Sequence, residues 1–295
     1  MTKFVIFGLG FLGSYVFSEI KSNNFVGLGT NFEHSTNNES MKIDIRKIDF
    51  VQKLLENEKP EIVINCVALG KIDFLEKNPE MAYSVNSSGA QNIAVICKKN
   101  NIRMIHISTD SVFDGTKNFY TEDESTNPLN VYAKSKILAE QHILNSCNNS
   151  VIIRTNFYGY DPNGNWFLNW IIDSLKQGKQ LTGYQDIHFN PLEISNLSKL
   201  IVELSLTDFT GIIHLSSDQA LSKYNFIKKV IEIFDFNPNL LKKGFYTTDP
   251  RVINRTVAPR PKNTVLSNKL LKTFLKTPLI SLDDSLKNIK TTFYI

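Results

Sequence analysis

The sequence predicts an α/β fold of the doubly wound class, in which helices cover both faces of a parallel sheet. In the first half of the chain, short apolar runs alternate with longer helix-like segments. A Gly-x-Gly-x-x-Gly turn joins the first apolar run to the first helical segment. The 295 residues, 42% of them hydrophobic, suffice for one large domain or two closely joined ones.

Strands are expected at the brief apolar runs, because strands buried on both faces read as nearly continuous hydrophobic segments. In chain order these runs are 4–7, 25–28, 61–66, 102–108 and 151–154, with shorter signals at 187–189 and 211–216. Helices are expected between them at 11–21, 48–57, 79–100 and 131–145. Pro79 suits an early helical position, and the polar residues 98–101 suit a helix exit.

The alternation loosens after residue 158. Helices are expected there at 166–177, 222–235 and 282–290, and a loop rich in proline and basic residues at 249–262. Residues 31–40 are polar enough to form a solvated loop.

Charge and cysteine usage exclude several classes of protein. The 33 basic and 29 acidic residues give a net charge of +4, spread along the chain, whereas nucleic-acid binders gather basic residues in one stripe. No run approaches the ~18 apolar residues of a membrane span, and the chain turns at Gly8 before a signal-peptide core is complete. Cys66, Cys97 and Cys147 lack ligand or disulfide spacing. We therefore expect a cytoplasmic protein with no metal, nucleic-acid or membrane partner.

The glycine turn has the chemistry of a dinucleotide site. It reads Gly8-Leu9-Gly10-Phe11-Leu12-Gly13. Glycines let the backbone approach a pyrophosphate, and the helix that follows offers free N–H groups and a partial positive charge. Glycines also form ordinary strand–helix turns, but a position directly between strand and helix favours dinucleotide binding.

The end of the second strand selects between NAD and NADP. Enzymes specific for NAD usually carry an acid there for the ribose 2′-hydroxyl, whereas this sequence has Gly29-Thr30-Asn31. Thr30 and Asn31 can donate hydrogen bonds to a 2′-phosphate, although the sequence places no arginine nearby to clamp it. NADPH is favoured, with NADH as the alternative.

Tyr132 and Lys136 lie four residues apart, on one face of a predicted helix. The Lys136 ammonium is expected to lower the pKa of the phenol and make it a usable proton donor. The same spacing occurs by chance on surface helices of lysine-rich proteins. Thr109 follows a predicted strand, at the sheet edge where such folds bind ligands, so a catalytic interpretation gains weight.

Six further motifs occur along the chain. They are Ile64-Asn65-Cys66-Val67-Ala68, Tyr83-Ser84-Val85-Asn86, Ser108-Thr109-Asp110-Ser111-Val112-Phe113-Asp114-Gly115, Asn127-Pro128-Leu129-Asn130-Val131-Tyr132, Arg154-Thr155-Asn156-Phe157-Tyr158-Gly159 and Ala258-Pro259-Arg260-Pro261. Through them, almost the whole chain resembles the extended short-chain dehydrogenases, and within these the dTDP-4-dehydrorhamnose reductase family.

This resemblance implies a Rossmann core that binds NAD(P) at residues 1–156 and a mainly substrate-binding lobe at 157–295, with segments near 187–216 returning to the core. It implies that Thr109, Tyr132 and Lys136 are catalytic, and that Thr109, Asp110 and Phe157 contact the substrate. Together with the residues argued above, the expected cofactor-binding residues are Gly8, Gly10, Phe11, Leu12, Gly13, Thr30, Asn31, Asp44, Ile45, Cys66, Val67, Ala68, Asn86, Tyr132 and Lys136.

Several positions leave two interpretations open. Arg260, in the proline-rich loop, either contacts a substrate diphosphate or forms a structural ion pair. Asp44 either flanks the adenine or is a turn residue at a strand end. Trp166 and Trp170 are interpreted as part of a packed helix face, in preference to stacking on a base or sugar. The sequence departs from the family at Ser111 and Phe157, among other positions, so the identity of the sugar stays open.

The expected function is NAD(P)H-dependent reduction of the 4-keto group of a nucleotide-linked 6-deoxy sugar, as in dTDP-L-rhamnose or related deoxysugar biosynthesis. One alternative is an NAD-dependent nucleotide-sugar epimerase or dehydratase that recycles its cofactor. Another is a non-catalytic cofactor-binding regulatory subunit like that of methionine adenosyltransferase. The resemblance also suggests a homodimer.

Overall fold

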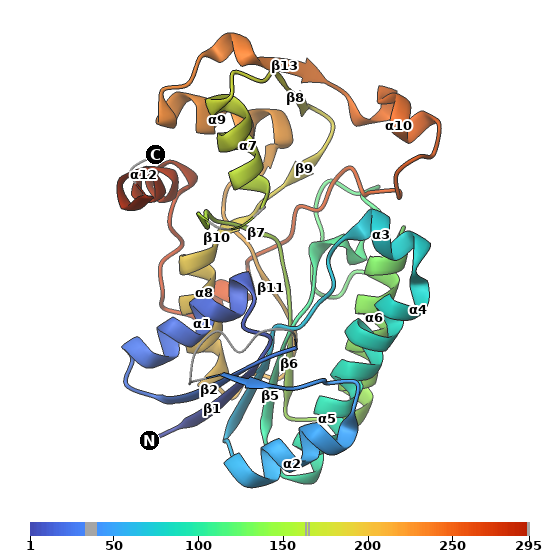
Figure 1. Ribbon diagram of the computed structural model, residues 1–295, viewed down its shortest axis with the longest axis vertical. Coiled ribbons are helices and arrows are strands. Elements are labelled where there is room, and N and C mark those ends of the chain that lie inside the picture. The colour runs from blue at the N-terminus through green and yellow to red at the C-terminus, as the bar shows by residue number, and fades with distance from the viewer. Residues whose placement is uncertain (33–39, 163, 165, 294–295) are drawn as a thin grey trace.

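Seven parallel strands form the central sheet within the part of the chain described by the computed structural model, residues 1–32, 40–162, 164 and 166–293 (Figure 1). The strand order is β11-β6-β5-β4-β1-β2-β3. The strands are β1 (Lys3–Phe7), β2 (Val26–Asn31), β3 (Ser40–Lys42), β4 (Ile62–Asn65), β5 (Arg103–Ile107), β6 (Ser150–Thr155) and β11 (Gly211–Leu215). The order reverses between β1 and β4, which is where doubly wound sheets bind ligands. The predicted fold class is confirmed.

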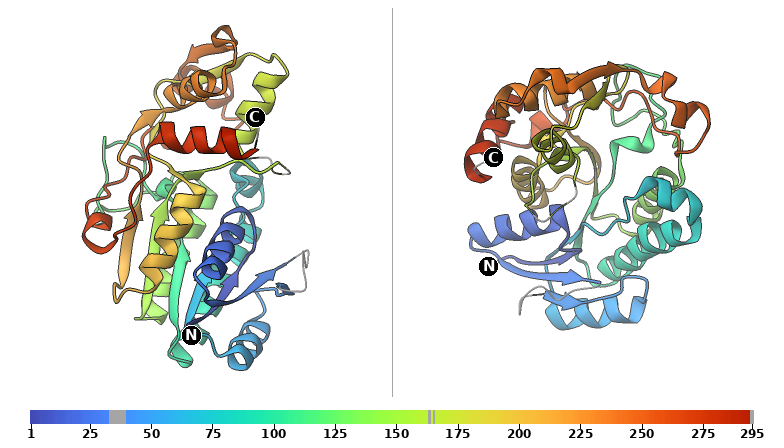
Figure 2. Two further views of the ribbon diagram at one scale, coloured as in Figure 1. Left: turned by 90° about the vertical axis from the view of Figure 1, so that its left-hand side faces the viewer. Right: turned by 45° about the horizontal axis from the view of Figure 1, so that its top comes forward.

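Helices cover both faces of the sheet (Figure 2). On one face lie α1 (Phe11–Ser22) and α8 (Ile194–Ser205). On the other lie α2 (Ile48–Glu58), α5 (Gly89–Lys99) and α6 (Val131–Ser146). The side chains of β1 alternate between the two layers, because successive strand residues point to opposite faces.

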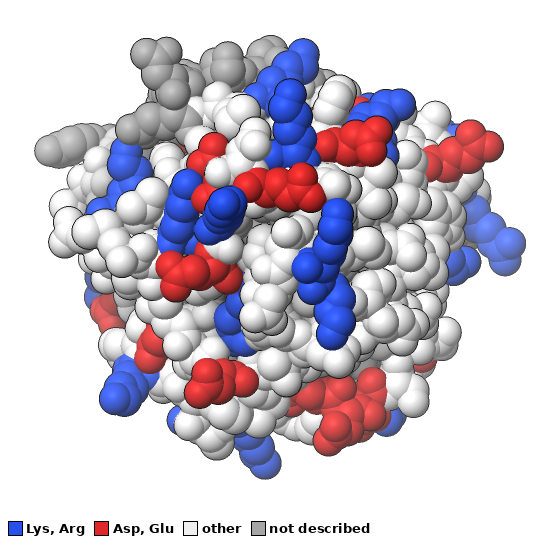
Figure 3. Space-filling view, turned by 90° about the horizontal axis from the view of Figure 1, so that it is seen from below, with Lys and Arg blue, Asp and Glu red and all other residues white. Residues whose placement is uncertain are grey.

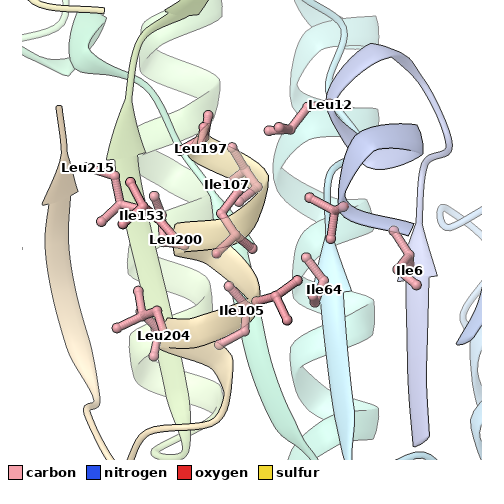
Figure 4. Packing of buried hydrophobic residues seen from close by; sticks show 14 of the residues in the cluster. Ile6, Leu12, Ile64, Ile105, Ile107, Ile153, Leu197, Leu200, Leu204 and Leu215 are labelled. Atoms are coloured by element: carbon pink, nitrogen blue, oxygen red, sulfur yellow. The ribbon is translucent and has the colours of Figure 1, made fainter. Parts of the chain in front are cut away.

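The hydrophobic cores follow this alternation. Phe4 and Ile6 pack with the buried residues of α1 and α8, whereas Val5 and Phe7 pack with those of α2, α5 and α6. Figure 4 shows leucines of α8, such as Leu200, against the isoleucines of the strands. Helices therefore bury both faces of the sheet, and folds of this class bind ligands at the carboxyl ends of the strands.

The helical stretch predicted at 79–100 forms as three consecutive segments. They are α4 (Pro79–Ala82), the π-helix η1 (Tyr83–Ser88) and α5. The short helix α3 (Ile72–Lys77) precedes them. π-Helical turns are rare and occur frequently at functional sites, and this one contains the predicted site residue Asn86.

A second lobe lies above the carboxyl ends of the strands (Figure 1). Its helices are α7 (Phe167–Lys176), α9 (Lys223–Phe234), α10 (Pro250–Ile253) and α12 (Leu282–Phe293). Three two-stranded sheets pair β7 (Phe157–Tyr158) with β10 (Leu192–Glu193), β9 (His188–Phe189) with β12 (Leu221–Ser222), and β8 (Leu181–Tyr184) with β13 (Leu241–Gly244). The remaining short elements are η2 (Asp110–Val112), η3 (Pro238–Leu240), η4 (Tyr246–Thr248) and α11 (Leu271–Phe274). Residues of α7, α9 and α12 form a core of their own in this lobe.

Two segments differ from the sequence-based expectation. The helix α8 was not anticipated, although its apolar residues recur at helical spacing and are buried against the sheet. The predicted loop at 31–40 is bounded by β2, which ends at Asn31, and β3, which begins at Ser40. Its residues 33–39 lie outside the described part of the chain.

The surface carries both signs of charge. On the face seen from below the sheet, basic and acidic side chains are interspersed without a stripe of one sign (Figure 3). Each helix of the described chain is too short or too polar to cross a bilayer.

Candidate active site

Two adjoining cavities lie at the carboxyl ends of the strands. Their volumes are about 350 and 380 Å³, and Gly10, Cys66 and Ala68 line both of them. The first extends from the glycine turn over β2, and the second from the same turn toward the second lobe. We call them the β2 cavity and the lobe cavity. Together they form a groove across the point where the strand order reverses.

The glycine turn shapes the middle of this groove. Gly8 has a φ of +89°, and a Cβ on Gly13 would lie 2.0 Å from the carbonyl oxygen of Gly8. A Cβ on Gly10 would meet no atom within 4 Å, so the backbone there is open to a ligand. Gly10 is also the N-cap of α1 and, having no side chain, leaves the first N–H groups of the helix uncapped. The turn therefore fits a pyrophosphate at an uncapped helix N-terminus.

The β2 cavity contains most of the predicted adenosine-side residues. Its lining includes Gly8, Gly10, Thr30, Asn31, Asp44, Ile45, Cys66, Val67 and Ala68. Asp44 is held by Arg46, whose Nε and Nη2 donate to its two carboxylate oxygens at 2.8 Å each. This side-chain hydrogen bond is the main influence that lowers the pKa of Asp44.

The expectation that no arginine stands near this end of β2 is wrong. Arg46 lines the same cavity as Thr30 and Asn31, and its guanidinium lies 5.0 Å from the ring centroid of Phe32. Strand β3 pairs with β2, placing Met41 beside Thr30, and the chain then turns at Asp44 to bring Arg46 to the cavity. The sequence did not reveal that Arg46 lies near Thr30, because no local pattern indicates that β2 pairs with β3.

The lobe cavity is lined by Thr109, Tyr132 and Lys136 together. Thr109 is the N-cap of η2, directly after β5, and its hydroxyl oxygen accepts a hydrogen bond from Ser111 N at 3.2 Å. Tyr132 and Lys136 lie one turn apart on α6, which begins at an Asn130 N-cap. The predicted catalytic residues therefore come together, although two secondary-structure elements supply them.

The Tyr132 phenol is surrounded by protein. Burial raises its pKa to about 12, and a hydrogen bond with the Thr109 side chain opposes the rise. The expectation that Lys136 lowers this pKa is wrong for the free protein. The Lys136 amino group instead contacts two other groups: Nζ lies 2.7 Å from the carbonyl oxygen of Ile107 and 3.1 Å from Nε2 of His106. The phenol is thus protonated at neutral pH and able to donate.

Asp110 and Phe157 line the lobe cavity as predicted. Asp110 is 2% exposed, and its Oδ2 accepts a hydrogen bond from Asn156 at 2.7 Å. Burial is the main cause that raises its pKa. The same cavity is lined by Ser111, which the sequence had indicated only as a position that bears on the identity of the sugar, and by Asn156, which was not predicted as a site residue. Their positions in the motifs around Thr109 and Phe157 were the available signal.

Trp166 also lines this cavity, and the interpretation of the two tryptophans as a packed helix face is wrong. Trp166 is 42% exposed and Trp170 is 44% exposed. The packed face of α7 is formed by other residues, among them Leu168 and Ile172. Trp166 is the N-cap of α7, and its indole stacks on the ring of Phe11 with centroids 4.6 Å apart.

Two predicted site residues line neither cavity. Asn86 is 1% exposed and exchanges hydrogen bonds with the backbone of Leu69, accepting from its N–H at 2.8 Å and donating to its carbonyl at 3.1 Å. It thereby supports the segment that lines the β2 cavity. Arg260 lines a separate cavity of about 600 Å³, and its Nη2 lies 2.9 Å from Oδ2 of Asp73. Its contact with a substrate diphosphate stays a prediction.

No group of three or more His, Cys, Asp or Glu side chains is arranged to hold a metal ion among the described residues. The groups in the groove that can bind or react with a ligand are an uncapped helix N-terminus, a protonated phenol and hydroxyl groups.

Comparisons with known proteins agree with this geometry. Residues 2–295 match the family described as the RmlD substrate binding domain. A dTDP-4-dehydrorhamnose reductase from Aggregatibacter actinomycetemcomitans is 31% identical over 66% of this chain and 67% of its own length. A probable low-salt glycan biosynthesis reductase from Haloferax volcanii is 27% identical over 99% of this chain and 98% of its own. The crystal structure of a dTDP-4-dehydrorhamnose reductase from Bacillus anthracis in complex with NADP superposes with a TM-score of 0.86 at 26% identity, covering 99% of this chain and 100% of that one.

Proposed function

The chain belongs to the RmlD substrate binding domain family, and on this premise we propose that it is an NAD(P)H-dependent reductase of nucleotide sugars. Its substrate is a nucleotide-linked 6-deoxy sugar with a keto group at C4, as in dTDP-L-rhamnose or related deoxysugar biosynthesis. The observation that carries the proposal is the joint placement of Thr109, Tyr132 and Lys136 in the wall of a cavity that continues into the glycine turn.

The groove fits a nicotinamide dinucleotide. Gly10 leaves open space at the α1 N-terminus for the pyrophosphate, and the β2 cavity has the size and apolar walls for an adenosine. When bound, the nicotinamide supplies the hydride for the reduction. Tyr132 and Lys136 are the residues placed to hold its ribose.

Tyr132 supplies the proton to the carbonyl oxygen of the sugar. A pKa of about 12 keeps its phenol protonated at neutral pH, as a proton donor requires. The Thr109 hydroxyl, already hydrogen-bonded to that phenol, orients the same oxygen. Asp110 and Phe157, which line the same cavity, contact the sugar. Holding the reacting groups in line accounts for a large share of the rate.

NADPH is the cofactor that the β2 cavity favours. Thr30 and Asn31 present hydrogen-bonding groups, and Arg46 adds a guanidinium suited to bidentate binding of a 2′-phosphate. Arg46 is engaged by Asp44 in the free protein, so binding a 2′-phosphate requires it to share or exchange that partner.

We also place the protein in the cytoplasm, because all three of its cysteines are free thiols. We further propose that the protein forms a homodimer and that Arg260 contacts the substrate diphosphate. The cofactor-binding core then comprises residues 1–156, and the substrate-binding lobe comprises residues 157–295.

Isotope transfer tests the reaction. NADPH deuterated at both hydrogens of the nicotinamide C4 is incubated with the protein and a dTDP-4-keto-6-deoxy sugar, and the product is analysed by mass spectrometry and NMR. We expect one deuterium at C4 of the sugar for each NADPH consumed. An epimerase or dehydratase that recycles its cofactor would give no net consumption, and this outcome would contradict the proposal.

A further inference from the structure

A buried chain of hydrogen bonds leads to Lys136 from the side opposite the cavity. Lys136 Nζ lies 3.1 Å from His106 Nε2, and His106 Nδ1 lies 3.1 Å from Asn65 Nδ2. The chain ends at Val67, whose backbone N–H donates to Asn65 Oδ1 at 3.0 Å. His106 and Asn65 are 0% exposed and Lys136 is 1% exposed, so the protein alone determines the direction of these bonds.

The backbone sets that direction. The N–H of Val67 can only donate, so the Asn65 amide must present its oxygen to Val67 and its NH₂ group to His106. Nδ1 of His106 therefore accepts. A neutral imidazole carries one proton, which must then lie on Nε2, facing Lys136. An ammonium has no lone pair, so this last contact is a hydrogen bond only when Lys136 is a neutral amine.

A charged Lys136 leaves one repulsive contact in every arrangement of the chain. If His106 Nε2 accepts from the ammonium, Nδ1–H faces the NH₂ group of Asn65. If the Asn65 amide turns over to relieve this, its NH₂ group faces the N–H of Val67. An unsatisfied buried donor costs about 1–3 kcal/mol. Burial and the neighbouring Lys136 hold the pKa of His106 well below 6.5, which excludes an imidazolium.

We propose that His106 is a positioning residue that donates its Nε2–H to Lys136 and thereby favours the neutral amine of Lys136 over the ammonium. With Lys136 neutral, one of its own N–H groups still donates to the carbonyl oxygen of Ile107. Every member of the chain is then satisfied. The inference concerns the proton supply of the reduction and so rests on the proposed function.

The surrounding groups are consistent with this state. Burial lowers the pKa of Lys136 to about 8, so the neutral amine predominates above that pH. The Cys66 thiol, directly after β4, is a further neighbour, and burial raises its pKa to about 12, so it stays uncharged. Glu140, on α6, favours the ammonium, but its carboxylate is already paired with Arg154 at 2.7 Å.

The proton balance gives this state a role. Reduction of a ketone places a hydride on carbon and a proton on oxygen, so each turnover takes one proton from solution. Tyr132 gives its proton to the substrate oxygen and recovers one from a charged Lys136, which is recharged from solvent. A neutral Lys136 in the free protein must therefore take up a proton when the anionic cofactor binds.

The tautomer of His106 can be measured without cofactor or substrate. The protein is labelled with ¹⁵N in its imidazole rings, and the His106 signals are assigned with His106→Gln. If that variant does not fold, glutamine variants of the other histidines assign them by elimination. We expect a protonated Nε2 and an unprotonated Nδ1 between pH 9 and 10, above the Lys136 pKa of about 8. A proton on Nδ1, or on both nitrogens, would overturn the inference.

The substitution Asn65→Asp reverses the direction of the hydrogen bonds between Asn65, His106 and Lys136, because an Asp side chain has the same shape as Asn but only accepts. A carboxylate accepts from both the Val67 N–H and His106 Nδ1–H, so Nε2 becomes an acceptor and Lys136 becomes charged. Asn196→Asp is the control, since Asn196 is likewise buried, at 1% exposed, but lies on α8, on the other face of the sheet. We expect the His106 tautomer to switch in Asn65→Asp and to remain in Asn196→Asp. An unchanged tautomer in Asn65→Asp would contradict the proposal.

Proton uptake provides a second readout. Calorimetry of NADPH binding at pH 9, where a group with a pKa of about 8 is mostly neutral, should show uptake of about one proton by the parent protein and nearly none by Asn65→Asp when run in buffers with different ionisation enthalpies. Equal uptake by the two proteins would overturn the inference. The Nε2–H tautomer together with a failure to reduce any keto sugar would overturn the proposed function instead.

Discussion

Arg154 and Glu140 form an ion pair in the interior, with Nη2 of Arg154 2.7 Å from Oε2 of Glu140 and both side chains 4% exposed. The Ser108 hydroxyl also donates to Glu140. The pair ties α6, which carries Tyr132 and Lys136, to β6 and to the end of β5, next to Thr109. The two parts of the candidate catalytic set are thus held together behind the cavity.

Glu140→Gln should destabilise the protein strongly, because it leaves the Arg154 charge buried without a carboxylate. Breaking one side of such a pair costs about 3–5 kcal/mol. The measurement is the free energy of unfolding in urea. Glu56→Gln is the control, since Glu56 pairs with Lys99 on the surface, where such pairs contribute about 0–1 kcal/mol. Equal losses in the two variants would show that the buried pair has no special role.

Tyr132→Phe should lower kcat by about 10²–10⁴-fold, because the phenol is the proposed proton donor. NADPH binding, followed by fluorescence titration, should change far less. Ser111→Ala is a matched control, because it removes another hydroxyl from the lining of the same cavity. If Tyr132→Phe retains near-normal turnover, another group must supply the proton.

Arg46→Gln should raise the KM for NADPH by about tenfold, a loss of about 1.4 kcal/mol, while leaving the KM for NADH nearly unchanged. The reason is the loss of the guanidinium proposed to bind the 2′-phosphate. Arg251→Gln is the control, because Arg251 holds Asp249 with a similar pair of hydrogen bonds outside both cavities. A parallel rise for NADPH and NADH would instead mean that Arg46 supports the adenosine pocket in general.

Acid should destabilise the protein below pH 6.5 through two buried histidines. Burial lowers the pKa of His214 to about 3 and that of His106 well below 6.5. The unfolded chain binds a proton at each site below pH 6.5, whereas the folded chain does not, so stability is lost as the pH falls. Each histidine contributes about 1.4 kcal/mol per pH unit within this window.

The free energy of unfolding measured between pH 6.5 and 5 checks this dependence. Removing one titrating group with His214→Gln should reduce the slope by the contribution of one proton. A slope that stays the same would mean that His214 is protonated in the folded protein.

The sequence predicted the core of the fold because its signals are local. The apolar runs around Phe4–Phe7 and the turn at Gly8 are buried on both sides or sterically restricted, so composition and glycine spacing reveal them. The helix α8 was missed although its pattern is amphipathic, because the second half of the chain has no regular alternation to place it.

The candidate site was predictable where one strand end or one helix supplies the residue. Thr109 and Tyr132 are examples. Arg46 was missed because its place beside Thr30 depends on the pairing of β3 with β2. His106 was treated as one histidine among five without metal spacing, since its link to Lys136 exists only after β5 packs beneath α6. Such non-local contacts leave no pattern in the chain.

The central claim is that this protein reduces a nucleotide-linked 4-keto-6-deoxy sugar with a nicotinamide cofactor. The most direct measurement is the decrease in absorbance at the nicotinamide band when the protein is mixed with NADPH or NADH and a panel of dTDP-, UDP- and GDP-linked 4-keto-6-deoxy sugars. We predict stoichiometric oxidation with at least one of these sugars, faster with NADPH than with NADH and severely reduced in Tyr132→Phe. Binding of NADPH without net oxidation by any sugar of the panel would contradict the claim.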